Sequence, residues 1–406
     1  MKEGGVPPPE IAISSLGEVT PCILPTDINI ADNVRIYIVC HLHKTSNDAN
    51  KADTDQHLHN IKMPSNTAAW QPKPGVPYEI KDTPYTSPPS DCVVIKNRAI
   101  ALNPIDFKLQ DTAIFPFLSY PTILGLDIAG EVVEVGSAVS SRLKLGDRVL
   151  ALAGGTSANK PSGAAFQEYT VVVARLVTKI PDSLSYNDAA VLPLGLATAA
   201  CGLFQYDQLA LQYPSISPKP TGQTILVWSG ASSVGVNAIQ LATAAGYEVI
   251  TMASPKNFEL VRGLGASEVF DYNADPATLL EQLTKAFEGK TLGGVLHTAG
   301  DASGAISLCA DLFTKVEGNK FFTTSVRLPE EVPTDFKHNR IFAATVADNA
   351  VGEAVFVDFL SQALADGRYK PAPQAEVVGS GLESLQRATD ILRKGVSAKK
   401  LVVSLN

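Results

Sequence analysis

The first half of the chain alternates apolar and polar residues in short runs, which is the period of β-strands. The runs are "CVVIKNRAIALNP" (residues 92–104), "GEVVEVG" (130–136), "GDRVLAL" (146–152) and "FQEYTVVVA" (166–174). Glycines between these runs indicate tight turns that join neighbouring strands. The pattern therefore predicts a small, partly open β-barrel.

After Pro181, segments with a helical period alternate with strand-like runs. Residues 182–204 combine Ser and Asp helix-start signals with apolar residues at helical spacing. Residues 223–254 follow the order strand, glycine turn, helix, glycine, strand, which is one βαβ unit. Further strands are expected at 267–272, 293–299, 319–325 and 340–346, and helices at 276–287 and 301–313. This alternation predicts an α/β fold with a parallel, doubly wound sheet and right-handed crossovers.

The C-terminal segment has two amphipathic helical runs and a last strand-like run. These are residues 351–367, 382–395 and 399–405. We expect this segment to fold back onto the β-rich domain. The predicted organisation is a catalytic domain over 63–190, a nucleotide-binding domain over 191–345 and a returning segment over 346–406.

Residues 1–62 differ from the rest of the chain, because they lack a sustained helical or strand period. Four of the six histidines fall in this segment, as the alternating pairs His41, His43, His57 and His59. Alternate histidines on a strand face one side, so a metal site is one interpretation. The polar composition favours the other interpretation, a disordered extension.

Composition excludes several classes of protein. The chain has 406 residues, 45% of them hydrophobic, which is enough for a large core. A formal net charge of -8 argues against a nucleic-acid partner. No apolar run reaches the roughly 20 residues that span a membrane, and no charged-then-apolar leader opens the chain. Five widely spaced cysteines do not suggest a disulfide framework. These features predict a soluble cytoplasmic protein.

The glycine turn of the βαβ unit is the first candidate binding site. It consists of Ser229, Gly230, Ala231, Ser232, Ser233, Val234 and Gly235. Small residues at this place let backbone N–H groups approach a pyrophosphate at the start of the helix, where the helix dipole favours negative charge. The alternative is a tight strand-to-helix turn without a ligand. The position between a strand and a helix favours the binding site.

The end of the second strand indicates which nucleotide binds. A site for NAD usually has Asp or Glu about 20 residues after the turn, to bind the ribose 2′-hydroxyl. Here the sequence reads Ala253, Ser254, Pro255, Lys256 and Asn257, without a carboxylate. Ser254 can donate a hydrogen bond to a 2′-phosphate and Lys256 supplies a compensating charge, so NADPH is predicted over NADH.

Two residues near this strand end keep an alternative interpretation. The alternative for Lys256 is a solvated surface lysine, with the phosphate contact favoured. Tyr272, at the end of the third strand, is a candidate to pack against the adenosine, and a plain strand-end tyrosine is the alternative.

Five segments together resemble the medium-chain dehydrogenase/reductase superfamily. They are "NPIDFK" (103–108), "LGLDIAGEVVEVG" (124–136), "GDRV" (146–149), "PLGLATAA" (193–200) and "SGASSVG" (229–235). Their order and spacing match from about Met63 to the C-terminus. The chain is most similar to the zinc-independent, fungal enoyl-reductase-like branch, of which "SPKNF" (254–258) is typical. The resemblance implies a GroES-like catalytic domain and a Rossmann domain.

The zinc-binding members of that superfamily carry metal ligands at positions that are changed here. Asn103 stands where the first cysteine would be, and Leu126 and Asp127 replace a His-Glu pair. From Met63 onward the chain has three cysteines and two histidines, too few for a catalytic and a structural zinc site. We therefore expect no metal, and alcohol oxidation is disfavoured without a Lewis acid.

Hydride delivery to an activated C=C bond needs no metal, because a conjugated carbonyl already makes the β-carbon electrophilic. The enolate that forms needs hydrogen-bond donors, and its α-carbon needs a proton. Asn103, Asp106 and Lys108 are the candidate catalytic residues on a loop that leaves a strand. Lys108 is predicted to donate the proton or bind the oxyanion, oriented by Asp106. The alternatives are a helix cap for Asp106 and a surface position for Lys108.

Three further candidates follow from the resemblance. Thr198 falls where the helix start of family members meets the nicotinamide, and Leu296 and His297 fall where their backbone passes beside it. Many relatives have Asp at the position of His297, and a lone histidine at a strand end is often structural.

Three functions remain open. The first is an NADPH-dependent enoyl reductase that acts on a small-molecule enone or an acyl substrate, which a polyketide synthase would present on its carrier. The second is a quinone oxidoreductase or alkenal reductase of the same fold. The third is an inactive NADPH-binding sensor or scaffold, against which the intact segments 103–108 and 229–235 argue.

Overall fold

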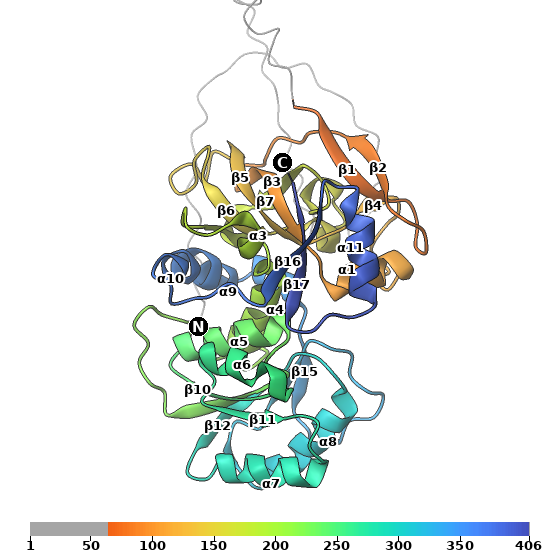
Figure 1. The fold of residues 1–406 in the computed structure, drawn as a ribbon. Coiled ribbons are helices and arrows are strands. Elements are labelled where there is room, and N and C mark those ends of the chain that lie inside the picture. Colours follow the sequence, from red (N-terminus) through yellow and green to blue (C-terminus); the bar gives the residue numbers. More distant parts are fainter. Residues whose placement is uncertain (1–63, 406) are drawn as a thin grey trace, which may run out of the picture. The chain divides into compact units, whose positions relative to one another are not determined.

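A computed structural model describes residues 64–405, and Figure 1 shows their fold. The predicted disordered extension over residues 1–62, with its four histidines, lies outside the described residues. The predicted division of the remaining chain at residues 190 and 345 stays a prediction.

The β-rich half forms a seven-stranded sheet in the order β16-β17-β3-β5-β6-β8, with β7 paired to β3. Its strands are β3 (Cys92–Ala101), β5 (Asp127–Val135), β6 (Arg148–Leu152), β7 (Tyr169–Val173), β8 (Val177–Lys179), β16 (Gln374–Ser380) and β17 (Lys399–Ser404). The last strand pairs antiparallel with β3, so the C-terminal segment returns to this sheet. A small second sheet contains β1 (Asn66–Gln71), β2 (Glu79–Thr83) and β4 (Thr122–Ile123).

The other half contains a parallel sheet in the order β11-β10-β9-β12-β14-β15, with β13 beside β12. Its strands are β9 (Gln223–Trp228), β10 (Glu248–Ala253), β11 (Glu268–Asp271), β12 (Thr291–His297), β13 (Glu317–Gly318), β14 (Phe322–Thr324) and β15 (His338–Arg340). The strand order reverses between β9 and β12, and ligands of such sheets bind beyond the carboxyl ends of the strands at this point.

Helices connect and cover the strands (Figure 1). The α-helices are α1 (Pro104–Asp111), α2 (Gly155–Ala158), α3 (Tyr186–Ala189), α4 (Pro193–Phe204), α5 (Ser233–Ala244), α6 (Phe258–Gly263), α7 (Pro276–Ala286), α8 (Ala302–Phe313), α9 (Ala350–Gly352), α10 (Leu360–Ala365) and α11 (Ser384–Arg393). Short 3₁₀ segments are η1 (Pro161–Gly163), η2 (Ala174–Leu176), η3 (Pro255–Asn257) and η4 (Ala343–Ala347), and the π-helix η5 (Glu353–Phe359) lies between α9 and α10. Side-chain caps such as Asp275 and Asp301 fix several helix starts.

One expected strand is wrong. The run 340–346 was predicted as a strand, but β15 ends at Arg340 and residues 343–347 form the 3₁₀ helix η4. The carbonyl oxygen of Phe342 accepts hydrogen bonds from the N–H and the hydroxyl of Thr345, at 3.1 and 2.8 Å. These local bonds turn the chain out of the sheet, because a threonine side chain offers the backbone an alternative to strand pairing.

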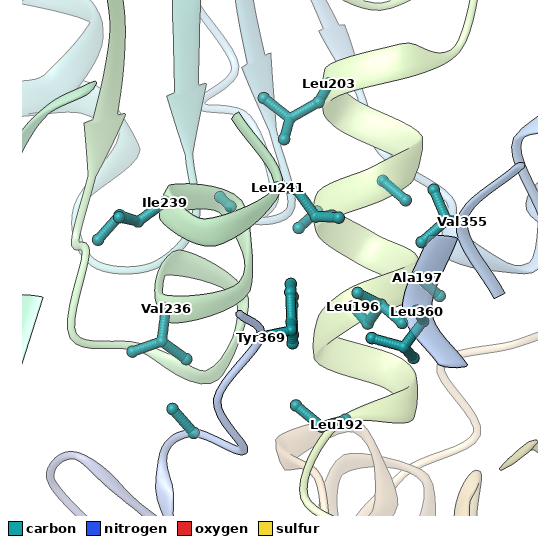
Figure 2. Close-up of a cluster of buried hydrophobic side chains, with 14 of the residues drawn as sticks. Leu192, Leu196, Ala197, Leu203, Val236, Ile239, Leu241, Val355, Leu360 and Tyr369 are labelled. Atoms are coloured by element: carbon teal, nitrogen blue, oxygen red, sulfur yellow. The ribbon is translucent and has the colours of Figure 1, made fainter. Parts of the chain in front are cut away.

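The core joins α4 to α5 and to the C-terminal helices, as Figure 2 shows. The labelled side chains of this cluster are Leu192, Leu196, Ala197, Leu203, Val236, Ile239, Leu241, Val355, Leu360 and Tyr369. Tyr369 is 2% exposed, and its hydroxyl donates to Asn237 Oδ1 at 2.7 Å. A Cβ on Gly195 would lie 2.7 Å from the carbonyl oxygen of Ser233, so the starts of α4 and α5 approach closely. The stretch Tyr186–Phe204 is apolar enough to span a membrane by composition, but 83% of it is buried here.

Candidate active site

The turn between β9 and α5 is a cradle of small residues. Ser232 caps α5, because its Oγ accepts the N–H of Gly235 at 2.9 Å and lies 2.8 Å from Thr298 Oγ1. A Cβ on Gly230 would lie 2.2 Å from Thr251 Oγ1, and one on Gly235 would lie 2.3 Å from a backbone oxygen. Both glycines are therefore required by the packing. The remaining predicted members, Ala231, Ser233 and Val234, line the same turn.

Ser233 adds an unsatisfied group to this cradle. Its hydroxyl oxygen is buried and has no hydrogen-bond partner within the described residues. Buried polar groups normally find partners, so this unpaired hydroxyl at a helix start is a candidate donor to a ligand.

The predicted 2′-phosphate residues lie at the ends of neighbouring strands. Ser254 follows β10 and receives a 3.1 Å hydrogen bond from Asn257 Nδ2 across the 3₁₀ turn that Pro255 opens. Lys256 is exposed, and no ion pair holds it among residues 64–405. Tyr272 follows β11 and is 48% exposed. The parallel pairing of β10 with β11 brings these residues to one edge of the sheet.

Asn103 and Asp127, which stand where zinc-binding members of the superfamily carry metal ligands, belong to a buried polar network. Asn103 Nδ2 donates to Asp127 Oδ2 at 2.9 Å, and Lys400 Nζ lies 2.8 Å from the same oxygen. Lys400 also donates to Asn103 Oδ1. The side chains of Lys400 and Asp127 are 5% and 0% exposed, so the ammonium and the carboxylate compensate each other away from water.

The carboxylate of Asp127 also binds the start of helix α4. Asp127 Oδ1 accepts the backbone N–H of Leu194 at 2.6 Å, in the first turn of α4. A carboxylate is favoured there, because the start of a helix carries unpaired N–H groups and partial positive charge. Asp127 therefore ties β5, β17 and α4 together.

Asp106 caps the N-terminus of α1. Its Oδ2 accepts the backbone N–H of Asn103 at 2.7 Å, which forms one half of a capping box. Complete burial raises the pKa of Asp106 to about 7, with a further contribution from the charge of Asp127. Its Oδ1 is buried and has no hydrogen-bond partner in the described part of the chain.

Lys108 lies on the exposed side of α1. Asp106 is buried, and no hydrogen bond or ion pair connects the two side chains within residues 64–405. The contact by which Asp106 was expected to orient Lys108 is thus not formed, whereas the capping alternative for Asp106 is observed. The catalytic role of Lys108 itself stays a prediction.

The three remaining candidates are buried on α4 and at the end of β12. Thr198 Oγ1 donates to the carbonyl oxygen of Leu194 at 2.7 Å. Leu296 packs beside Gly202, where a Cβ would lie 2.6 Å from Leu296 Cδ1. His297 Nδ1 lies 2.9 Å from Thr324 Oγ1, and its ring stacks on Phe322 with centroids 5.5 Å apart. These contacts give His297 a structural role in the sheet.

His297 nevertheless keeps one free nitrogen. Burial lowers the pKa of its imidazole to about 4, so the ring is neutral at physiological pH. Its Nε2 is buried and unpaired among the described residues. Within residues 64–405, no group of three or more His, Cys, Asp or Glu side chains is arranged to hold a metal ion.

Comparison with known proteins identifies the family. Residues 89–182 match the family model of the alcohol dehydrogenase GroES-like domain. Dehydrogenase pigH of Monascus ruber is 48% identical over 375 residues, which cover 84% of this chain and 100% of that protein. The chain belongs to the medium-chain dehydrogenase/reductase superfamily. Trans-enoyl reductase himH of Aspergillus japonicus is 40% identical over 345 residues, covering 84% of this chain and 98% of that protein.

Solved structures show the same fold. An alcohol dehydrogenase superfamily protein from Novosphingobium aromaticivorans aligns with a TM-score of 0.69 at 24% identity, covering 84% of this chain and 100% of that one. The fold class predicted from the sequence, a GroES-like domain with a parallel Rossmann sheet, is confirmed.

The oxidoreductase fold implies a nicotinamide cofactor, and the residues of this chain fit one. The glycine cradle admits a diphosphate close to the backbone, and the unpaired Ser233 hydroxyl offers it a donor at the start of α5. The unpaired His297 Nε2 lies at the carboxyl end of the adjacent strand β12.

Sequence reasoning missed Lys400. The signal lay in "KKLVVSL", because the two lysines open strand β17 and successive side chains of a strand point to opposite faces. In the structure Lys399 is exposed and forms an ion pair with Glu376, whereas Lys400 is buried.

Proposed function

We propose that the protein is a zinc-independent, NADPH-dependent reductase of α,β-unsaturated carbonyl compounds, of the enoyl reductase type. The observation that carries this proposal is the network of Asn103, Asp127 and Lys400. A buried ammonium there already neutralises the carboxylate that a metal would need. A metal-free site suits C=C reduction better than alcohol oxidation.

NADPH is the proposed cofactor because the strand end after β10 offers a hydroxyl and a cation. Ser254 and the exposed Lys256 stand there without a competing carboxylate, so a 2′-phosphate would be neutralised and a ribose diol would not be favoured. Tyr272 at the end of the neighbouring strand β11 is proposed to contact the adenosine.

The bound cofactor supplies the hydride that the β-carbon accepts. The chain's own groups then act on the enolate oxygen and the α-carbon. One N–H of the Asn103 side-chain amide donates to Asp127, and the second is proposed to donate to the enolate oxygen. Lys108 is proposed to stabilise the enolate or protonate its α-carbon. Asp106 contributes by fixing the backbone of Asn103.

The proposed substrate is a small enone or an α,β-unsaturated acyl group, which a polyketide synthase carrier would present in the cytoplasm. Relatives named trans-enoyl reductases, 31% to 40% identical to this chain, support that choice. One of the solved structures that share the fold is a quinone oxidoreductase, which favours quinones as the second candidate substrate.

The test is oxidation of NADPH by the full chain in the presence of enones, enoyl thioesters and quinones. The proposal requires turnover of the enones or enoyl thioesters with formation of the saturated carbonyl. Turnover of quinones alone would favour the second candidate, and binding of NADPH without any turnover would favour the inactive scaffold.

A further inference from the structure

Tyr369 lies between helices α4 and α5, as Figure 2 shows. It follows α10, in the segment that returns to the GroES-like half, and its ring packs edge-on against Phe359 with centroids 6.1 Å apart. Burial raises the pKa of the Tyr369 phenol well above its usual value, so the hydroxyl keeps its proton and acts as a donor. Such a buried donor requires an acceptor among its neighbours.

The acceptor is Asn237, a buried residue in the interior of α5. Its Oδ1 accepts the Tyr369 hydroxyl at 2.7 Å, and its Nδ2 donates to the carbonyl oxygen of Ser233 at 2.7 Å. Asparagine is a poor residue for a helix interior, and a buried amide is costly unless both of its ends are paired. Here one end is paired to the C-terminal segment and the other to the first turn of α5.

The carbonyl group of Ser233 lies where α4 and α5 approach closely. A Cβ on Gly195 would lie 2.7 Å from that carbonyl oxygen and 2.9 Å from Asn237 Nδ2. The backbone N–H groups of the same turn are those that would face a diphosphate. Because Asn237 lies one turn further along α5, its bond to Ser233 fixes the orientation of this first turn.

A second amide on α5 holds the segment that carries Tyr369. Gln240 Nε2 donates to the carbonyl oxygen of Lys370 at 3.1 Å, and Gln240 Oε1 accepts the N–H of Lys370 at 2.8 Å. Asn237 and Gln240 are three residues apart, so they lie on one face of the helix. The segment is thereby fixed on α5, and Tyr369 has a defined position from which to orient Asn237.

We infer that Tyr369 is a positioning residue for the cofactor, which acts through Asn237 to hold the first turn of α5 in the orientation that binds the diphosphate. This inference rests on the cofactor named in the proposed function. Without the tyrosine hydroxyl, Asn237 Oδ1 would be buried without its donor. The amide would then be free to turn away from Ser233, and the first turn would lose its fixed orientation.

The experiment measures binding of NADPH to the full chain by fluorescence titration, and binding of adenosine 2′-monophosphate by displacement of NADPH. The second probe carries the 2′-phosphate but no diphosphate. Tyr369→Phe should raise the Kd for NADPH by about 3- to 10-fold, the range for one lost hydrogen bond, and leave the Kd for the monophosphate unchanged. Asn237→Leu should have a similar effect. The double variant should lose no more affinity than either single variant, because the two residues act in series.

The matched control is Tyr247→Phe, which should leave both dissociation constants unchanged. Tyr247 is also buried, and its Oη accepts the N–H of Gln212 at 3.3 Å, beyond the other end of α5.

Three results would overturn the inference. The first is unchanged NADPH affinity in Tyr369→Phe, with folding verified by circular dichroism. The second is an equal loss of affinity for NADPH and for the monophosphate, which would show a general loosening of the fold. The third is additive losses in the double variant. No enone is present in this experiment, so failure to reduce any enone would refute only the proposed function.

Discussion

Asp127 and Lys400 form a 2.8 Å ion pair in which both side chains are almost completely removed from water. The pair joins β5 to the last strand of the chain, and the second oxygen of Asp127 holds the start of α4. The buried carboxylate of Asp127 thus connects Asn103 and Lys400 to the first turn of α4. Loss of either residue should destabilise the protein, because the remaining charge would be buried without compensation.

Lys400→Met should destabilise the protein by about 3–5 kcal/mol, because it leaves the Asp127 carboxylate buried and uncompensated. Adding Asp127→Asn should recover much of that loss. Equilibrium unfolding in urea measures both. The matched control is Lys399→Met, which removes a pair between side chains 51% and 42% exposed and should cost less than about 1 kcal/mol. Equal effects of the two lysine variants would refute the buried-pair account.

Asp106 should make stability depend on pH. Burial raises its folded-state pKa from 3.8 to about 7, so the folded protein keeps a proton that the unfolded chain releases. The stability contributed by this group is therefore complete below pH 3.8 and decreases as the pH rises to about 7. Relative to the wild type, Asp106→Asn should become more stable across this range. A difference in the free energy of unfolding between the two proteins that stays the same at every pH would contradict the prediction.

Lys256→Ala should raise the KM for NADPH and leave the use of NADH nearly unchanged, since only the phosphate contact is lost. A charge-assisted contact of roughly 1.5–3 kcal/mol corresponds to about a 10- to 150-fold effect. Steady-state kinetics with both cofactors measure it. Lys315→Ala is the control, because Lys315 is exposed ahead of β13, which pairs with the amino-terminal end of β12. Comparable use of NADH and NADPH by the wild type would show the assignment of Ser254 and Lys256 to be wrong.

Lys108→Met should lower kcat and kcat/KM for enones together, by about 10²–10³-fold, since its cation is proposed to act on the enolate of the transition state. NADPH affinity should change little. Quinone reduction should suffer less, because quinone oxygens can take protons from water. Lys315→Met serves as the exposed-lysine control. Enone turnover equal to that of the wild type would refute the catalytic role of Lys108. Its exposed position on α1 would then mark it as a surface lysine.

Local pattern was enough for most of the fold. Alternation located β3, and the glycine turn located β9 and α5, because period and turn chemistry are properties of neighbouring residues. The strand predicted at 340–346 was wrong for the same reason. Its apolar residues fit a strand, but the hydrogen bonds from Thr345 to Phe342 favour a 3₁₀ turn.

The site was predictable only in part. The cradle residues were found because they are contiguous, whereas Lys400 is 297 positions from Asn103 and joins it only through strand pairing. The contact of Tyr369 with Asn237 also depends on how segments 132 positions apart meet. Asp106 was read as a partner of Lys108, but its burial directs it to the backbone of Asn103 instead.

The most direct test of metal-free C=C reduction follows a labelled hydride. Full-length protein treated with a chelator is mixed with an enone and NADPH deuterated at the nicotinamide C4, and the product is examined by mass spectrometry and NMR. We expect undiminished turnover after chelation and a saturated carbonyl product with deuterium on its β-carbon. An allylic alcohol with deuterium on the carbonyl carbon, or activity that disappears with the chelated metal, would contradict it.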